Sequence, residues 1–185
     1  GGFLTSAEQL QFFVEGKSGS CAGLPSCNPK LGSYDGNTTT GTATMRRDGF
    51  ASVEPIQPSA AGVLTTEPLT FSAPGAATDT FLFVNVYIAH NGSLEVELLA
   101  NGAVTLSAVP VQGHTNSTNF KLSWDGVAAG GAVDSLGRWP SPAEMPRLRF
   151  TLRGRVELYA FWLTRDARCI FFQNHGIPLA LILTL

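Results

Sequence analysis

Six acidic residues of the chain are candidates for acid–base chemistry. They are Glu95, Glu97, Asp125, Asp134, Glu144 and Glu157. Hydrolysis of a glycosidic bond needs two carboxyl groups held about 5–10 Å apart, one of which acts as a general acid. Glu95 and Glu97 alternate with apolar residues, so they are expected on the wet face of one strand. No Gly-x-Ser-x-Gly motif offers a nucleophilic serine. The sequence therefore predicts no catalytic residue in this chain.

Trp139 is the aromatic residue that we expect at the surface, because it lies in a stretch rich in glycine and proline. An exposed aromatic ring can stack on the apolar face of a sugar. Arg138 precedes it and can donate hydrogen bonds to hydroxyl groups. Trp139 and Arg138 are therefore the predicted glycan contact, with packing of the loop as the alternative for Trp139. The remaining aromatic candidates are predicted to be core residues: Trp124, Tyr159 and Trp162.

The densest polar cluster is Arg46, Arg47 and Asp48, followed by Gly49. Asp-Gly is a turn signal, and an arginine beside it can pair with the aspartate or with nearby carbonyl oxygens. We predict a structural turn at the seam between two parts of the chain. The alternative is a direct contact with a carboxylate or a sugar at that seam.

Cysteine usage points to an oxidising compartment. Cys21 and Cys27 enclose a short loop containing Gly23 and Pro25, which predicts a small disulfide loop, with two free thiols as the alternative. Cys169 is left over. A metal site needs a closer group of ligands, and the histidines are scattered over the chain: His90, His114 and His175. We predict no metal and no cofactor.

Three glycosylation motifs begin at Asn37, Asn91 and Asn116, each in a stretch expected to be a loop. They favour a secreted or cell-surface protein. No signal peptide is visible, and Gly1 has no methionine before it. We therefore interpret the start of the chain as a cut end.

Composition limits the range of functions. Charged residues make up 14% of the 185 residues, against about 25% in typical soluble domains. The net charge of −2 gives no basic surface, which argues against a nucleic-acid partner. Hydrophobic residues at 44% are sufficient for a core, and the length fits one domain plus a fragment of another.

Alternating apolar and polar residues predict a run of short strands over residues 63–165. Residues 81–88 are apolar on both faces apart from one asparagine, as in a central strand. Hairpin turns are predicted at Asn91-Gly92 and Asn101-Gly102, and Gly154 is predicted to reverse the chain. Residues 127–146 are expected to be loop, with one helical turn near 142–145.

The two ends of the chain have a different pattern. Residues 1–53 contain expected strands at 10–14, 38–45 and 50–53, and residues 54–62 form a linker. The apolar tail, residues 166–185, has no turn rhythm. A membrane span needs about 20 apolar residues, and the uninterrupted apolar stretch here is much shorter, so no span is predicted. The tail could be one more strand or an unrelated appended end, and we favour the second.

The stretch 41–52 reads Gly-Thr-Ala-Thr-Met-Arg-Arg-Asp-Gly-Phe-Ala-Ser. It resembles the junction between propeller and sandwich in five-bladed β-propeller proteins related to family 32 glycoside hydrolases. Further segments resemble the sandwich strands of that family in order: 62–71, 82–86, 92–99, 147–153 and 158–162. The likeness covers about residues 10–163. The chain departs from the family pattern at the Cys21–Cys27 insertion, the long loop 127–145 and the tail after Cys169.

The resemblance implies an all-β chain: an antiparallel β-sandwich or jelly roll, preceded by a few strands of an incomplete propeller blade. The family's catalytic carboxylates lie in earlier blades, so none can be carried over to this chain. The implied function is a non-catalytic accessory domain that braces the missing propeller and contacts glycan. The alternative is a stand-alone, lectin-like carbohydrate-binding module. Apolar side chains left exposed on the first strands would favour the accessory domain.

Overall fold

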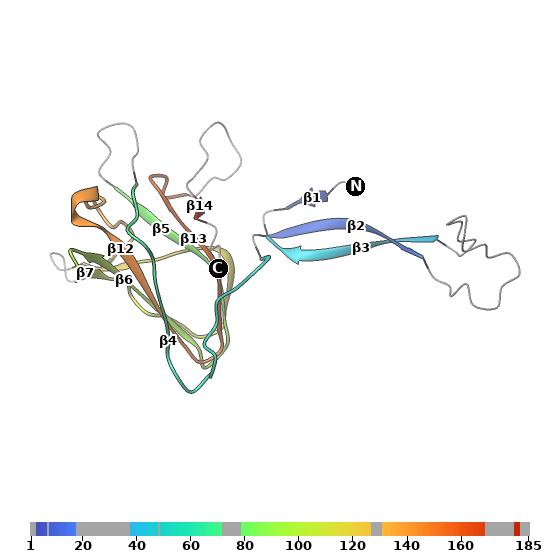
Figure 1. Ribbon diagram of the computed structural model, residues 1–185, viewed down its shortest axis with the longest axis horizontal. Helices are drawn as coiled ribbons and strands as arrows, with labels where there is room; N and C mark the ends of the chain where they lie inside the picture. Colours follow the sequence, from blue (N-terminus) through green and yellow to red (C-terminus); the bar gives the residue numbers. More distant parts are fainter. Residues whose placement is uncertain are drawn as a thin grey trace, which may run out of the picture. The chain divides into compact units, whose positions relative to one another are not determined.

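The computed structural model describes residues 3–6, 8–17, 38–47, 49–71, 79–126, 131–168 and 180–181. The chain forms two compact units, Gly1–Arg47 and Asp48–Leu185, both built from strands (Figure 1). Within the described ranges, the one helical element is a single 3₁₀ turn, η1 (Pro142–Glu144), at the predicted place. The prediction of an all-β, antiparallel fold is confirmed. No helix in those ranges is long and apolar enough to cross a membrane.

The first unit is one antiparallel sheet with the order β1-β2-β3. Its strands are β1 (Phe3–Thr5), β2 (Gln9–Lys17) and β3 (Thr38–Arg46). The threonines of β3 favour this conformation because β-branched side chains fit a pleated surface. The turn between β1 and β2 is closed by Ser6, whose hydroxyl oxygen accepts a hydrogen bond from the backbone N–H of Gln9 at 3.0 Å.

The prediction of a strand at residues 50–53 is wrong, because the structure has no strand between β3 and β4 in the described residues. The chain turns at Arg47, whose backbone N–H donates to the carbonyl oxygen of Glu8 at 2.8 Å. The following segment makes one isolated antiparallel bridge, between Val53 and Leu158 of the second unit. The bridge fixes the segment at Val53, whereas the side chain of Phe50 is exposed.

The second unit is a sandwich of two antiparallel sheets. The first sheet contains β4 (Gly62–Thr65), β12 (Arg147–Arg153), β6 (Ser93–Ala100) and β7 (Ala103–Ser107) in that order, with β8 (Val111–Gln112) also paired with β6. The second sheet contains β14 (Ala180–Leu181), β13 (Val156–Thr164), β5 (Phe81–Ile88) and β9 (Thr115–Lys121). A small separate ladder joins β10 (Trp124–Gly126) to β11 (Gly131–Val133).

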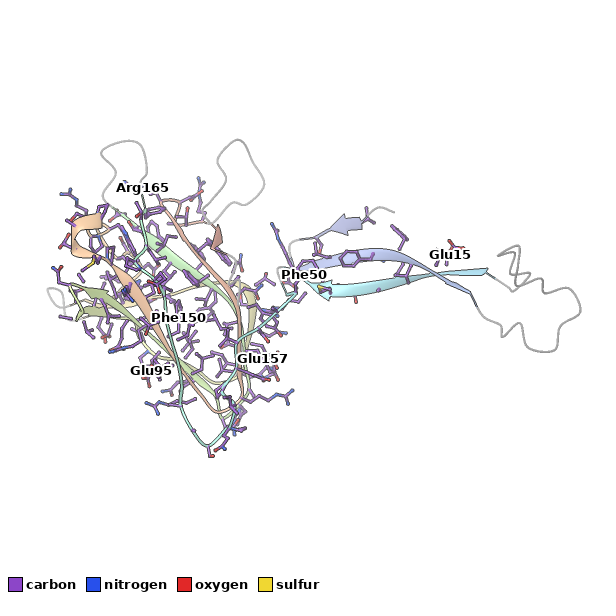
Figure 2. The ribbon with its side chains drawn as sticks, in the orientation of Figure 1. Glu15, Phe50, Glu95, Phe150, Glu157 and Arg165 are labelled. Atoms are coloured by element: carbon purple, nitrogen blue, oxygen red, sulfur yellow. The ribbon has the colours of Figure 1, made fainter. Side chains whose placement is uncertain are left out.

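The core lies between these two sheets. Along β12 and the first six residues of β6 every second side chain is buried, as the alternation in the sequence predicts, whereas the last three residues of β6 are all buried. Figure 2 labels Phe150 of β12, which is fully buried, and its ring lies 5.0 Å from that of Phe161 on β13 in the opposite sheet. Burying one such side chain contributes about 1.5–3 kcal/mol.

The predicted central strand is confirmed, since β5 pairs with β13 on one side and β9 on the other. Its second face is also buried: Asn85 has no exposed surface, and Phe83 stacks on Trp162 with ring centroids 5.9 Å apart. A β-bulge lies between Leu158 and Ala160 of β13. The extra residue shifts the side-chain alternation, so that Leu158 and Phe161 both belong to the same core.

The predicted hairpin at Asn91-Gly92 is wrong, because β5 and β6 lie in different sheets. The reversal at Gly154 likewise joins β12 in the first sheet to β13 in the second. These two crossovers pack against each other, and the N–H of Ala89 donates to the carbonyl oxygen of Arg155 at 3.0 Å. The hairpin at Asn101-Gly102 is confirmed: φ is 52° and 78°, and β6 pairs with β7.

Three other segments differ from the sequence expectation. The run of strands expected from residue 63 begins with a strand that ends at Thr65. Residues 120–124 of that run are divided between the end of β9 and the start of β10, and the loop expected over 127–146 contains β11. In the tail, the short strand β14 (Ala180–Leu181) pairs with Phe161 and Trp162 of β13. One more strand is therefore present in the tail, at residues 180–181.

Candidate ligand-binding site

A pocket of about 600 Å³ lies at one end of the first sheet of the sandwich. Its walls come from β6, β7 and the segment that leads into η1, and their residues are Leu98, Ala100, Thr105, Leu106, Leu136, Arg138, Trp139, Pro140, Ser141 and Glu144. Pockets that bind small molecules commonly measure about 300–1,000 Å³ and combine an apolar lining with a few polar groups. This pocket has both properties.

Backbone hydrogen bonds hold the segment 136–144 at both ends. The N–H of Leu136 donates to the carbonyl oxygen of Thr80 at 2.8 Å, and the N–H of Asn101 donates to the carbonyl oxygen of Glu144 at 2.7 Å. The second bond joins η1 to the turn between β6 and β7. The backbone of η1 is therefore fixed against that turn.

The prediction that Trp139 lies exposed at the surface is wrong: its side chain is 6% exposed and belongs to the hydrophobic core. Its ring meets Phe71 edge to face, with centroids 6.3 Å apart. The indole closes the end of the sandwich, because the loop folds back over apolar residues that would otherwise meet water. Trp139 lines the pocket without forming an exposed platform, whereas Arg138 is exposed as expected.

Glu144 is held by Ser141, whose backbone N–H and hydroxyl donate to Oε2 at 2.7 and 2.8 Å. The backbone hydrogen bond is the main cause that lowers the pKa of Glu144, followed by the hydroxyl and, weakly, by the charge of Arg138. Glu144 is therefore an anion at neutral pH. Within the described part of the chain, Oε1 of Glu144 and the guanidinium of Arg138 have no hydrogen-bond partner.

The two hydroxyls of the pocket have already donated their protons. Thr105 Oγ1 donates to the carbonyl oxygen of Leu98 at 3.1 Å, and Ser141 Oγ donates to Glu144. Each oxygen keeps a lone pair that can accept a further bond. The sequence identified Trp139, Arg138 and Glu144 separately but missed Thr105 and Ser141. The Ser-x-x-Glu spacing of Ser141 and Glu144 is a helix-start signal that could have placed the serine beside the carboxylate.

The other acidic candidates lie outside this pocket. On the outer face of the first sheet, Arg149 Nε is 2.6 Å from Glu97, and Arg153 Nε is 3.6 Å from Glu95, labelled in Figure 2. Asp125 is exposed, and Glu157 accepts a hydrogen bond from the hydroxyl of Tyr159. Within the described ranges, no group of three or more His, Cys, Asp or Glu side chains is placed to hold a metal ion.

Asp134 pairs with Lys121 at 2.6 Å and accepts a hydrogen bond from Ser123 at 3.0 Å. The hydrogen bond from Lys121 is the main cause that lowers the pKa of Asp134. Because the folded-state pKa lies below the ordinary value of about 3.9, the pair stabilises the fold above that value, and the stabilisation is lost as the pH falls through the folded-state pKa.

Replacing Asp134 by asparagine is therefore expected to lower the melting temperature slightly at neutral pH and not at all in strong acid. Thermal unfolding of both proteins between about pH 2 and 7 measures this difference. The effect is small because the pair is solvent-exposed. A difference that stays constant down to the acid end of the range would show that the charge of Asp134 contributes nothing.

The remaining predicted site residues are not brought into the pocket. Arg46 and Arg47 are half-buried in the first unit, and both have interaction partners. Asn91 is exposed in the crossover that follows β5, and Asn116 is exposed on β9, a strand rather than the expected loop. Several predicted residues lie outside the described ranges: Cys21, Cys27, Asn37, Asp48 and Cys169.

Comparison with known proteins gives no relative for this chain. No family model, no curated protein and no solved structure matches it.

Proposed function

We propose that this chain is a non-catalytic accessory domain of a secreted glycoside-hydrolase-like protein, in which it braces a β-propeller. On this proposal the first unit supplies strands to the last blade, and the sandwich supports the propeller from outside. The single observation that carries the proposal is the apolar face of the first unit. The exposed Asn91 and Asn116, each at the start of a glycosylation motif, support secretion.

The register of the first unit gathers its apolar residues on one face. Leu10 lies opposite Met45, Phe12 opposite Ala43, and Val14 opposite Gly41. Direct partners on neighbouring antiparallel strands point to the same side of a sheet. One face of β2 and β3 is therefore continuously apolar. On this face the side chain of Val14 is 45% exposed.

A sheet with an apolar face is stable when another layer covers that face. A propeller blade has four strands, whereas the first unit has three in its described part. On its other face, Phe13 is 51% exposed. Neighbouring propeller strands and blades would cover both faces, which is the support for assigning this sheet to a propeller.

Hydrogen exchange tests this proposal. It is measured on the purified chain and on the native, glycosylated protein, which is recovered with an antibody against the sandwich. We expect β2 and β3 to exchange rapidly in the purified chain and slowly in the native protein. The sandwich strands β5 and β12 should be protected in both. Mass spectrometry of the native protein should also find propeller strands, either in the same polypeptide or in a bound one.

Two matched variants make the test specific. Val14→Asp places a charge on the apolar face and is expected to abolish protection of β2 and β3 in the native protein. Thr44→Asp places the same charge on the opposite face, since Thr44 is the partner of Gln11, and should have a much smaller effect. Slow exchange of β2 and β3 in the purified monomer would overturn the proposal, because the sheet would then need no partner.

A further inference from the structure

We propose that the pocket formed by β6, β7 and residues 136–144 binds a neutral saccharide, with sugar hydroxyls held by Glu144 and Arg138. The pocket lies wholly within the second unit. Binding there goes beyond the bracing function and does not depend on it.

The charges of the pocket favour a neutral ligand. Its walls carry one carboxylate, Glu144, and one guanidinium, Arg138, and the two are close enough for Arg138 to help lower the pKa of Glu144. An anionic ligand attracted to Arg138 would be repelled by Glu144. A cationic ligand attracted to Glu144 would be repelled by Arg138. A hydroxyl group can donate to the carboxylate and accept from the guanidinium without either penalty.

The hydrogen-bonding state of the other groups favours a ligand with several hydroxyls. Oε1 of Glu144 accepts only, and the hydroxyl oxygens of Thr105 and Ser141 are left as acceptors because their protons are already donated. The pocket therefore presents three acceptors and one multiple donor, Arg138. An ionised carboxylate brings only acceptors and would leave these oxygens unpaired, whereas neighbouring sugar hydroxyls both donate and accept.

The apolar lining matches the remaining surface of a sugar ring. Leu98, Leu106 and Leu136 line the pocket together with the indole of Trp139. The C–H groups of a sugar ring are apolar and can pack against such side chains. The hydrogen bond from Asn101 to Glu144 holds the polar wall in place before a ligand arrives, so little ordering is needed on binding.

Titration of the complete chain with neutral mono- and disaccharides, followed by amide chemical shifts in NMR, tests this inference. The panel contains glucose, galactose, mannose, fructose and sucrose at millimolar concentrations. We expect saturable shifts confined to the amides of residues 98–106 and 136–144. Leucine and inorganic phosphate are included as a zwitterionic and an anionic probe, and neither should shift the same amides.

Two variants assign the contacts. Arg138→Ala and Glu144→Gln are each expected to weaken saccharide binding about tenfold or more, since hydrogen bonds to charged groups are the stronger ones. Arg153→Ala and Glu67→Gln remove the same chemistry from side chains outside the pocket and should leave the affinity unchanged. Unchanged spectra elsewhere in the chain verify that each variant is folded.

Three results would overturn the inference: no saccharide shifts the pocket amides, a saccharide binds with equal affinity to both pocket variants, or leucine binds there in place of sugars. These results are independent of the exchange experiment on the first unit, because the titration uses the purified chain without a propeller. Saccharide binding can therefore fail while bracing stands, and bracing can fail while saccharide binding stands.

Discussion

Replacing Phe150 by alanine is expected to lower the free energy of unfolding of the sandwich by about 3–5 kcal/mol. Phe150 is fully buried on β12, the strand that pairs with both β4 and β6, and its ring meets Phe161 of the opposite sheet. The substitution leaves a cavity where the two sheets touch, and the surrounding strands cannot close it without losing their pairing. Natural domains have a stability of about 5–15 kcal/mol, so a large part of the total would be lost.

Chemical denaturation followed by tryptophan fluorescence measures this loss. All three tryptophans (Trp124, Trp139 and Trp162) lie in the second unit, so the signal reports unfolding of the sandwich alone. Val104→Ala is the matched control, because Val104 is an exposed apolar residue of β7 and should change stability by well under 1 kcal/mol. A denaturation midpoint of Phe150→Ala equal to that of the control would contradict the assignment of Phe150 to the core.

Gly154→Ala is the second substitution with a large expected effect, because two separate costs act at this residue. Gly154 has a φ of +69°, a conformation that costs a non-glycine residue about 1–2 kcal/mol. A Cβ atom there would also lie 2.5 Å from the carbonyl oxygen of Asn91 in the neighbouring crossover. The Cβ position is set by the backbone of one crossover, and the oxygen belongs to the backbone of the other, so relief of the clash would require the two crossovers to separate.

Two further glycine variants separate these costs. Gly102 has a similar φ of +78° but open space around its would-be Cβ, so Gly102→Ala should show the conformational cost alone. Gly92 has no positive φ, but its Cβ would lie 2.7 Å from the carbonyl oxygen of Arg155, so Gly92→Ala should show the steric cost alone. We expect Gly154→Ala to be more destabilising than Gly102→Ala by about 1–3 kcal/mol, the usual range for overpacking.

The same denaturation measurement, together with soluble yield, compares the three glycine variants. Equal stability of Gly154→Ala and Gly102→Ala would show that the crossovers move apart at no cost. The close approach of the two crossovers would then have no role in holding the sheets together.

The strands themselves were largely predictable from the sequence. The alternation along β6 and β12 and the two apolar faces of β5 are local patterns, because side chains alternate between the two faces of any strand whatever its partners are. The turn at Asn101-Gly102 was predictable for a similar reason. Its two residues favour the positive φ that a tight hairpin turn requires, and β6 and β7 follow each other directly.

Tertiary pairing decided what the local signals left open. Asn91-Gly92 carries the same kind of turn signal as Asn101-Gly102, yet it leads from one sheet to the other. A turn dipeptide specifies backbone angles and not the sheet that the next strand joins. That choice depends on partners distant in sequence, such as the pairing of β12 with β4 and β6. The bulge in β13, which returns Phe161 to the core, depends on its partner strand in the same way.

The candidate site divides along the same line. The sequence by itself determined which residues carry charge or an aromatic ring, and so it identified Arg138, Trp139 and Glu144 as residues of interest. It could not determine that the loop folds back and buries Trp139, because burial depends on the open end of a core assembled from distant strands. Nor could it place Arg138 and Glu144 in one pocket with Thr105 of β7. That arrangement depends on the hydrogen bond by which the backbone of Asn101 holds η1 against the β6–β7 turn, a contact between segments about forty residues apart that only the assembled sandwich brings together.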